Sequence, residues 1–179
     1  VNGVDGVVLN SGSGRAGRSG RTGGGGGGGG AGGAGNLYDA AVMHAFFRIL
    51  AFVEDEQRVV EEGIYRIPGA ASEYEKICAE VMSGKVVQDL KIYQLHSVCS
   101  SVKSILRESQ PLLDKDILQN PTPEGFRRWI RTLKESDEMK FQLAERLFLH
   151  LHRVADRSDV NLMTANNLAI VFARNLFPD

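Results

Sequence analysis

Apolar residues recur at helical spacing through most of the chain beyond its glycine-rich start. The first such segment spans residues 37–56, and its apolar positions are Val42, Ala45, Phe46, Ile49, Leu50 and Val53. Spacings of three and four residues place these side chains on one face, which predicts an amphipathic helix. A second, short helical segment is expected through Val59 and Val60. Gly63 would end it, because glycine adopts the left-handed conformation easily.

Two more helices are predicted in the middle of the chain. One spans residues 72–82, with Ser72 as its N-cap and Glu75 as the capping-box partner three residues later. The other spans residues 94–108 and is the most clearly amphipathic segment of the chain. Its apolar stripe consists of Leu95, Val98, Val102, Ile105 and Leu106. Pro111 follows, and proline cannot continue a helix interior.

Three helices are predicted in the C-terminal part of the chain. Thr122 and Pro123 open the first of them as N-cap and first helical residue, and it extends to Leu133. The second spans about residues 138–155, and the third begins at Thr164. Period-two alternation, which is typical of a half-buried strand, is sustained nowhere. The predicted fold class is therefore all-α, a single helical bundle-type domain over residues 36–179.

Composition separates the start of the chain from this domain. Residues 1–35 are rich in glycine and serine and carry Arg15, Arg18 and Arg21. Such a segment buries almost no apolar area and has high backbone entropy, so a disordered linker is expected. An RNA-binding tail is the alternative, but no aromatic residues are interleaved with the arginines for base stacking. The solvated linker is the favoured interpretation.

Charge and cysteine usage point to an intracellular protein without a nucleic-acid partner. The net charge is −1, and because the first 35 residues carry +2, the predicted domain carries −3. A mildly acidic domain is poorly suited to nucleic acid. Cys78 and Cys99 lack metal-ligand spacing and fit small core positions in a reducing compartment. No apolar run approaches the length of a membrane span, so a cytoplasmic location is expected.

The sequence offers no independent active site. It has no phosphate-binding loop with a Lys-Ser/Thr pair, so nucleotide binding by this chain is not expected. His150 and His152 are two residues apart on a predicted helix and point to different faces, which argues against a shared metal and favours surface or partly buried packing. A serine elbow and a cysteine with an adjacent base are also missing. No metal and no cofactor of the chain's own are therefore predicted.

Two basic features remain to be explained. Arg66 lies in a loop bounded by Gly63 and Gly69, between Ile64 and Ile67. The isoleucines could anchor the loop while the guanidinium points outward. Alternatively, the arginine could fold back onto the neighbouring glutamates of residues 61–62, and spacing alone leaves these two possibilities open.

The second feature is a polar strip on the helix predicted over residues 94–108. A helical wheel places His96, Ser100, Lys103 and Arg107 along the edge of the apolar stripe. Lys103 and Arg107 are four residues apart and face the same way, with no acidic residue three or four positions from either. Their counter-charge could come from a carboxylate elsewhere in the domain, from an acidic protein partner or from a phosphate.

Three segments resemble the motifs of RhoGAP domains, in the family's order. Residues 62–69, EGIYRIPG, are similar to E-G-I-[FY]-R-x-[SP]-G, in which the arginine is the finger residue. Residues 95–98, LHSV, and 102–108, VKSILRE, resemble H-x-V followed by L-K-x-x-L-R-E-L-P-x-P-L. Residues 161–164, NLMT, and 167–176, NLAIVFARNL, resemble N-K-M-T followed by N-L-A-[IV]-V-F-G-P-N-L.

This resemblance implies a function. Arg66 would be the arginine finger, Lys103 and Arg107 would support the GTPase interface, and Asn175 would be a further contact or a loop-positioning residue. The partner would be a Rho-, Rac- or Cdc42-type small GTPase in its GTP-bound state, and it would bind the GTP and Mg²⁺ itself. The chain would therefore be a GTPase-activating protein in signal transduction rather than an enzyme with its own active site.

The match is incomplete in ways that favour an alternative function. The family's L-P-x-P-L stretch is altered around Pro111, and Ala173-Arg174 replaces Gly-Pro before Asn175. Loss of a glycine and a proline changes the backbone options there. Family members usually continue into a closing helix beyond the position of Asp179, so we expect a truncated domain. The alternative is a catalytically weak RhoGAP-like module that binds small GTPases or other signalling partners as a scaffold.

Overall fold

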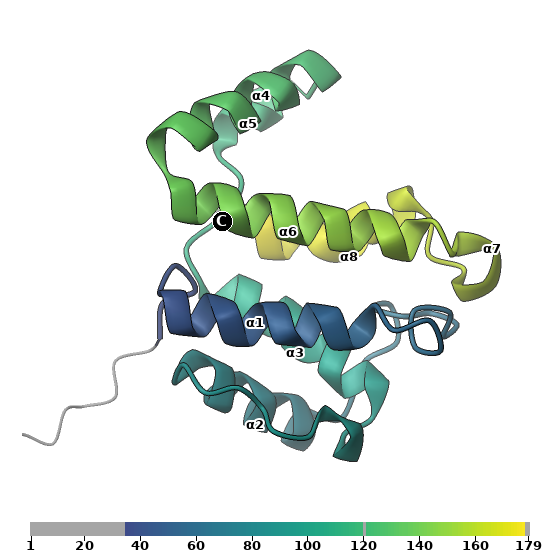
Figure 1. Ribbon diagram of the computed structural model, residues 1–179. Helices are drawn as coiled ribbons and strands as arrows, with labels where there is room; N and C mark the ends of the chain where they lie inside the picture. Colours follow the sequence, from purple (N-terminus) through teal and green to yellow (C-terminus); the bar gives the residue numbers. More distant parts are fainter. Residues whose placement is uncertain (1–34, 120, 178–179) are drawn as a thin grey trace, which may run out of the picture. The chain divides into compact units, whose positions relative to one another are not determined.

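The computed structural model of the chain describes residues 35–119 and 121–177, and every regular element in these ranges is a helix (Figure 1). The helices are α1 (Ala40–Val53), α2 (Ala71–Met82), the 3₁₀ helix η1 (Leu90–Ile92), α3 (Leu95–Glu108), α4 (Lys115–Gln119), α5 (Pro123–Ser136), α6 (Glu138–Ala155), α7 (Ser158–Asn161) and α8 (Ala165–Leu176). The predicted all-α class is confirmed. The linker predicted over residues 1–35 lies outside the described residues, except for Gly35.

Four helices enclose the core of this domain. Helix α1 packs against α3 and α6, and α8 packs against the same two helices, while α2 covers α3 and α1. Figure 1 shows α1 in front of α3 and α6 in front of α8. The largest wholly buried side chains include Phe46 on α1, Ile105 on α3, Leu147 on α6 and Phe172 on α8. Burial of these apolar stripes stabilises the domain.

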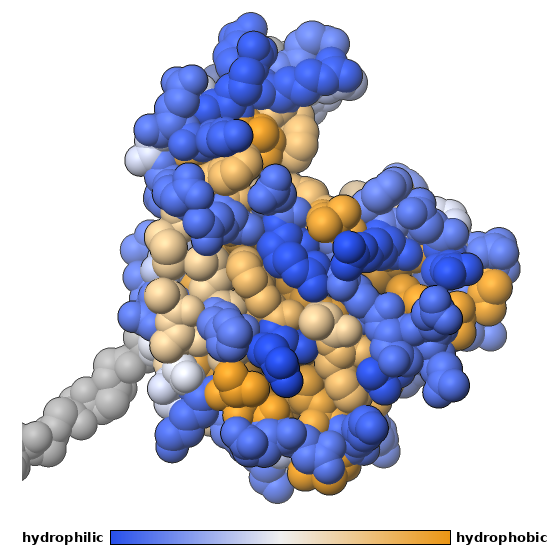
Figure 2. Space-filling view, viewed as in Figure 1, coloured by the Kyte–Doolittle hydropathy of each residue, from blue (hydrophilic) through white to orange (hydrophobic). Residues whose placement is uncertain are grey.

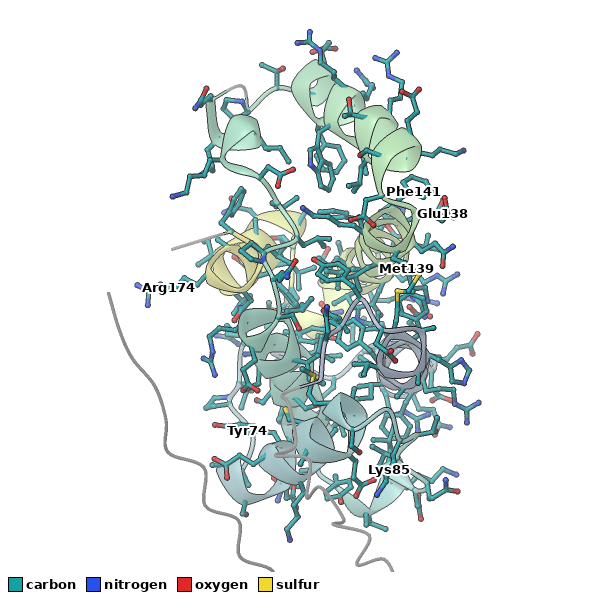
Figure 3. The ribbon with its side chains drawn as sticks, turned by 90° about the vertical axis from the view of Figure 1, so that its left-hand side faces the viewer. Tyr74, Lys85, Glu138, Met139, Phe141 and Arg174 are labelled. Carbon is teal, nitrogen blue, oxygen red and sulfur yellow. The ribbon has the colours of Figure 1, made fainter. Side chains whose placement is uncertain are left out.

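Helices α4 and α5 lie to one side of this core. They pack against each other, and α5 also packs against α6. Figure 2 shows mostly hydrophilic side chains over α4 and α5, with apolar side chains between hydrophilic ones on the rest of this face. Figure 3 shows Glu138, Met139 and Phe141 where α6 begins beneath α5. The aromatic rings of Phe126 and Phe148 meet edge-on, 5.3 Å apart, and join α5 to α6.

Helix starts that depend on local sequence were predicted correctly. The Thr122 hydroxyl accepts a hydrogen bond from the Gly125 amide at 3.0 Å. Thr164 accepts from the Asn167 amide at 3.2 Å in the same way. Helix α3 begins at Leu95, one residue later than predicted, and ends at Glu108 as predicted.

Two other predictions were wrong. Helix α1 ends at Val53, and residues 54–60 form turns instead of a second helical segment through Val59 and Val60. Arg58 ends α1 by donating to the Phe52 carbonyl at 2.6 Å. Helix α2 begins at Ala71, so Ser72 lies inside the helix and is not its N-cap.

Both cysteines occupy core positions, as predicted. Cys78 and Cys99 are buried and free, and burial raises the pKa of Cys99 to about 12. Their thiols are therefore protonated at neutral pH and unreactive as nucleophiles. Within residues 35–119 and 121–177, no helix is long and apolar enough to cross a membrane. The same residues contain no cluster of three histidine, cysteine or acidic side chains that could hold a metal.

Candidate functional site

The loop that carries Arg66 is fixed at its start by main-chain hydrogen bonds. The Gly63 amide donates to the Asn161 carbonyl at 2.8 Å, and the Gly63 carbonyl accepts from the amides of Arg66 and Ile67 at 2.8 and 2.9 Å. Gly63 has a φ of +70°, and a Cβ at this position would lie 2.7 Å from Ile67 Cδ1. A side chain here would therefore strain the loop and push Ile67 away.

Asn161 links this turn to the segment after α1 and to the end of α6. Its side-chain amide donates to the carbonyls of Val59 and Val154 at 2.9 and 2.8 Å. Its side-chain oxygen accepts from the Met163 amide at 2.8 Å. Asn161 is fully buried, and these bonds give both the nitrogen and the oxygen of its side-chain amide a partner, as a buried polar group requires. The chain before Arg66 is thereby tied to the end of α6.

Tyr65 anchors the centre of the loop. Its side chain is completely buried, and its hydroxyl lies 2.5 Å from Nε2 of His150. Its ring also meets the Phe172 ring edge-on at 5.0 Å. Its backbone has a φ of 66°, in the left-handed region that a bulky residue rarely adopts. The strained residue directly precedes the exposed Arg66.

Helix α3 holds the rest of the loop. Lys103 Nζ donates to the Tyr65 carbonyl at 2.6 Å. The hydroxyls of Ser100 and Ser97 accept from the amides of Gly69 and Ala70, both at 3.0 Å. These contacts hold the two residues that precede α2, and α2 itself has no side-chain cap.

Gly69 permits the close approach of the loop to α3. A Cβ at Gly69 would lie 2.2 Å from the Cα of Ser97 and 2.3 Å from its amide nitrogen. Both atoms belong to the helix backbone, which cannot move aside as a flexible side chain could. Any larger residue would therefore lift the end of the loop away from α3.

The Arg66 side chain has no ion-pair partner among the described residues of the domain. It is exposed and does not fold back onto Glu61 or Glu62. One guanidinium nitrogen would lie 3.2 Å from a Cβ placed on Gly63, so the side chain lies over that glycine. Of its two apolar neighbours, Ile64 is buried as expected, whereas Ile67 is 40% exposed and does not anchor the loop.

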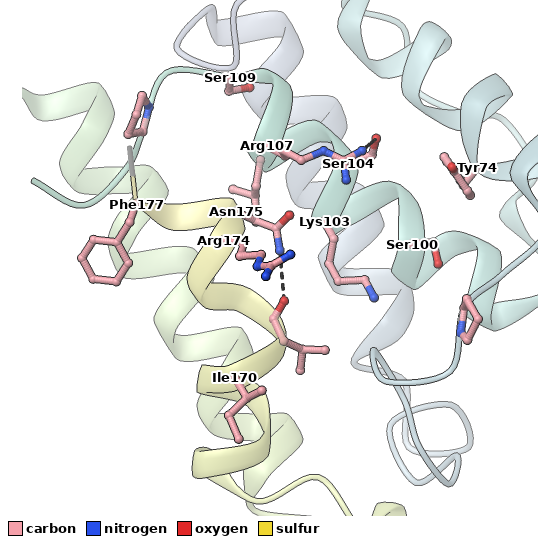
Figure 4. Close-up of a pocket in the computed structure, with 14 residues that line it drawn as sticks. Tyr74, Ser100, Lys103, Ser104, Arg107, Ser109, Ile170, Arg174, Asn175 and Phe177 are labelled. Atoms are coloured by element: carbon pink, nitrogen blue, oxygen red, sulfur yellow. Dashed lines mark hydrogen bonds between the residues drawn. The ribbon is translucent and has the colours of Figure 1, made fainter. Parts of the chain in front are cut away.

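A groove of about 700 Å³ lies beside the loop, between α3 and α8 (Figure 4). Pro68 lines it from the loop, Lys103 and Arg107 from α3, and Arg174 and Asn175 from α8. All of its charged lining residues within the described part of the chain are cationic. The structure thus brings Lys103, Arg107 and Asn175 together. Lys103 also binds the carbonyl of Tyr65, the residue before Arg66. A groove of this charge favours an anionic partner.

Neither of the two α3 cations is in direct contact with a carboxylate of the described residues, although the Ser104 hydroxyl links Arg107 to Glu108. Arg107 donates to the Ser104 hydroxyl at 3.3 Å, and within the described residues neither Arg107 nor Lys103 forms an ion pair. Burial, with Arg107 nearby, lowers the pKa of the half-buried Lys103. A lysine kept beside another cation and away from acidic groups is electrostatically unfavourable unless a partner supplies negative charge.

Helix α8 runs through the segment that departs from the family's motif. Ala173 and Arg174 are helical, and α8 ends only at Leu176. Asn175 is nearly buried, and its amide donates to the Val171 carbonyl at 3.0 Å, as the dashed line in Figure 4 marks. Arg174 projects outward from α8 (Figure 3). Arg174 therefore supplies a third cation to the groove, while the Asn175 amide bonds within its own helix.

A partly buried carboxylate lies behind the loop. Glu54, the C-cap of α1, accepts hydrogen bonds from Nη1 and Nη2 of Arg146 at 2.5 and 3.0 Å and from Arg153 Nη1 at 2.5 Å. Its Oε1 also lies 2.9 Å from Nδ1 of His150. Burial opposes its ionisation, but the hydrogen bonds from His150 and Arg146, together with the charge of Arg146, lower the pKa of Glu54 to about 2.

Glu54 should make the domain sensitive to acid. Because its pKa falls from 4.5 when unfolded to about 2 when folded, its contribution is complete above pH 4.5 and is lost as the pH falls toward 2. We expect Glu54→Gln to lower the free energy of unfolding by about 2 kcal/mol near neutral pH. The difference from wild type should shrink by about 1 kcal/mol per pH unit between these two pKa values.

Urea unfolding of both proteins at several pH values measures this difference. Glu56→Gln is the matched control, because Glu56 is exposed and within the described residues has no ion pair. A Glu54→Gln deficit that stays constant across this acid range would contradict the linkage.

Several of these residues were not singled out from the sequence. His150 was expected in surface or partly buried packing, yet it is wholly buried and hydrogen-bonded at both ring nitrogens. Its partners Tyr65 and Glu54 lie 85 and 96 residues away in the chain, so no local spacing could connect them. Asn161 was quoted only as part of a motif, and that motif was the one available signal of its role.

Comparison with known proteins places these features in a family. A RhoGAP domain model matches residues 44–179. The chain is 29% identical over 136 residues to mouse GEM-interacting protein, with 64% of this chain and 14% of that protein covered. It is 34% identical over 125 residues to Rho GTPase-activating protein 68F of Drosophila melanogaster, with 64% and 26% covered. The chain thus spans about a quarter or less of these relatives.

Solved structures agree with the sequence relatives. The BH domain of Graf, the GTPase regulator associated with focal adhesion kinase, superposes with a TM-score of 0.67 at 25% identity, covering 79% of this chain and 82% of that one. Human Rho GTPase activating protein 15 has the same fold, with a TM-score of 0.62 at 21% identity over 74% of this chain and 68% of that one. With the family's motifs gathered around one loop and groove, this chain belongs to the RhoGAP domain family.

Proposed function

We propose that this domain accelerates GTP hydrolysis by a Rho-family small GTPase, and that Arg66 is the arginine finger. The observation that carries the proposal is the state of the Arg66 loop. Its main chain is fixed at Gly63, Tyr65 and Gly69, while the guanidinium is exposed and, among the described residues, without an ion pair. A rigid loop with an unengaged arginine is ready to enter another protein's active site at little cost in ordering.

The chemistry follows from the charge of the transition state. Transfer of the γ-phosphoryl group to water spreads negative charge over the phosphate oxygens and the leaving oxygen. A guanidinium held against these oxygens stabilises the transition state more than the ground state. The GTPase would supply the GTP, the Mg²⁺ and the residue that orients water, so this domain contributes only Arg66 to the reacting centre.

The groove beside Arg66 would bind the GTPase surface. Lys103 and Arg107 supply positive charge from α3, and Arg174 supplies it from α8. Lys103 also holds the Tyr65 carbonyl, so it supports the finger loop as well as the interface. Asn175 bonds within α8 in the free domain, which favours a role in shaping the groove.

Single-turnover GTP hydrolysis tests the proposal directly. Rho-, Rac- and Cdc42-type GTPases are loaded with GTP, and the rate is measured with increasing amounts of the domain. We expect saturable acceleration of about 10³-fold or more on at least one of them. If the domain binds a GTP-loaded partner but accelerates none, it is a scaffold module. The cation at Arg174 would then be the first feature to remove, by Arg174→Ala.

A further inference from the structure

A hydrogen-bonded chain runs from the end of α1 to the residue before Arg66. The Tyr65 hydroxyl lies 2.5 Å from His150 Nε2, and His150 Nδ1 lies 2.9 Å from Glu54 Oε1. The side chains of Tyr65 and His150 have no exposed surface. An ionised carboxylate can only accept, so His150 carries its hydrogen on Nδ1 and its Nε2 accepts from the Tyr65 hydroxyl. All polar groups of the chain then have partners.

The surroundings favour this neutral form of His150. Burial lowers the pKa of His150, against the opposing effect of Glu54. The charged groups that face the ring are Glu54 from α1 and Arg146 and Arg153 from α6, while Tyr65 faces it from the loop. Both arginines also bind Glu54, so the carboxylate is held in place from two sides. The far end of the chain is therefore rigid.

The near end of the chain restrains a strained residue. Tyr65 has a φ of 66°, and such a conformation in a bulky residue persists only where surrounding contacts enforce it. The contacts here are the side-chain bond to His150, the ring packing on Phe172 and the bond from Lys103 to the carbonyl. Relaxation of Tyr65 toward an ordinary conformation would swing the direction of the chain at Arg66.

We infer that Glu54, His150 and Tyr65 position Arg66 through this hydrogen-bonded chain and thereby set the maximal rate of stimulated GTP hydrolysis. The inference rests on the proposed function. Glu54 and His150 are positioning residues, because they lie behind the loop and do not line the groove. Breaking the chain should therefore lower the rate of the chemical step while binding through the groove stays intact.

The test separates rate from binding. Single-turnover hydrolysis is measured over a range of domain concentrations for wild type and His150→Phe, and it yields a maximal rate and a half-saturating concentration. His150→Phe leaves the buried Tyr65 hydroxyl without an acceptor, which is costly. We expect the maximal rate to fall about ten- to a hundredfold, as small displacements of a catalytic group typically cause. The half-saturating concentration should change less than about twofold.

Two further variants sharpen the result. His152→Phe is the matched control, because His152 is on the same helix with its side chain 70% exposed, and it should leave both quantities unchanged. The double variant Tyr65→Phe/His150→Phe removes both polar partners, which restores stability more readily than either single change. We expect its melting temperature to recover toward wild type while its maximal rate stays low.

Three outcomes would overturn the inference. His150→Phe could lower only the melting temperature and keep the wild-type maximal rate, which is the mark of a purely structural role. The double variant could recover the rate together with stability, which would assign positioning to ring packing alone. If His150→Phe does not fold, Tyr65→Phe, which deletes one oxygen atom, must show the same split or the inference fails. A wild-type domain that stimulates no GTPase would instead refute the proposed function.

Discussion

Replacement of Arg66 by alanine should lower the GTP hydrolysis stimulated by this domain by about 10³-fold or more, the usual contribution of an arginine finger. The side chain is exposed and, within the described residues, takes part in no ion pair, so its removal leaves no buried charge unpaired. The loop keeps its anchors at Tyr65 and Gly69, because none of their bonds involves the arginine side chain. The loss should therefore fall on catalysis and spare folding.

Arg66→Lys sharpens this expectation. An ammonium keeps the charge but lacks the planar fork that reaches two oxygens together, so the lysine variant should recover only a small part of the rate. Both variants should bind the GTP-loaded GTPase with affinities close to wild type. Single-turnover hydrolysis at saturating domain and a melting temperature for each variant provide the measurement.

An exposed arginine away from the groove serves as the control. Arg128 on α5 is exposed and does not line the groove, so Arg128→Ala should stimulate hydrolysis as wild type does. Equal stimulation by Arg66→Ala and wild type would remove Arg66 from the mechanism. Equal losses in Arg66→Ala and Arg128→Ala would point to a general charge effect instead of a finger.

The sequence predicted those parts of the fold that local physical chemistry controls. Helix α3 was predicted to within one residue because its apolar stripe repeats at helical spacing. The start of α5 was predicted from Thr122 as a cap and Pro123 as the first helical residue, and the start of α8 from its apolar spacing; in both helices a threonine side chain caps an amide three residues later. Such signals involve neighbours in the chain, so a single sequence displays them.

The errors occurred where tertiary contacts replace local ones. Ser72 has the chemistry of an N-cap, but α2 starts one residue before it, directly after Ala70, whose amide is bound by Ser97 on α3. Val59 and Val60 continue the apolar pattern of a helix. In the structure they lie in a turn, where the Val59 carbonyl accepts a hydrogen bond from the Asn161 side chain. A partner a hundred residues away leaves no mark on local periodicity.

The candidate site divides in the same way. Arg66, Lys103 and Arg107 could be proposed because they stand in patterns that need an explanation, and the structure brings Lys103 and Arg107 into one groove beside the Arg66 loop. The hydrogen-bonded residues behind the Arg66 loop could not be proposed from the sequence. Glu54 and His150 belong to ordinary helical segments, and only the fold unites them with Tyr65.

Removal of both α3 cations should weaken binding of the GTP-loaded GTPase by about 100-fold and flatten its salt dependence. Lys103 and Arg107 line the groove and form no ion pair within the described residues, so their charges are available to an anionic surface. Binding of the double variant Lys103→Ala/Arg107→Ala is measured by fluorescence polarisation at low and high salt. Lys85→Ala/Lys91→Ala, with two lysines that do not line the groove, is the matched control.

The two single variants should differ in kind, because only Lys103 holds the finger loop. Arg107→Ala should raise the half-saturating concentration about tenfold and keep the maximal rate, as loss of a peripheral charge does. Lys103→Ala should also lower the maximal rate, since it releases the Tyr65 carbonyl that the ammonium now holds at 2.6 Å. If Lys103→Ala changes binding alone, its bond to Tyr65 does not position Arg66. If neither variant alters affinity or its dependence on salt, the groove between α3 and α8 is not the GTPase-binding surface.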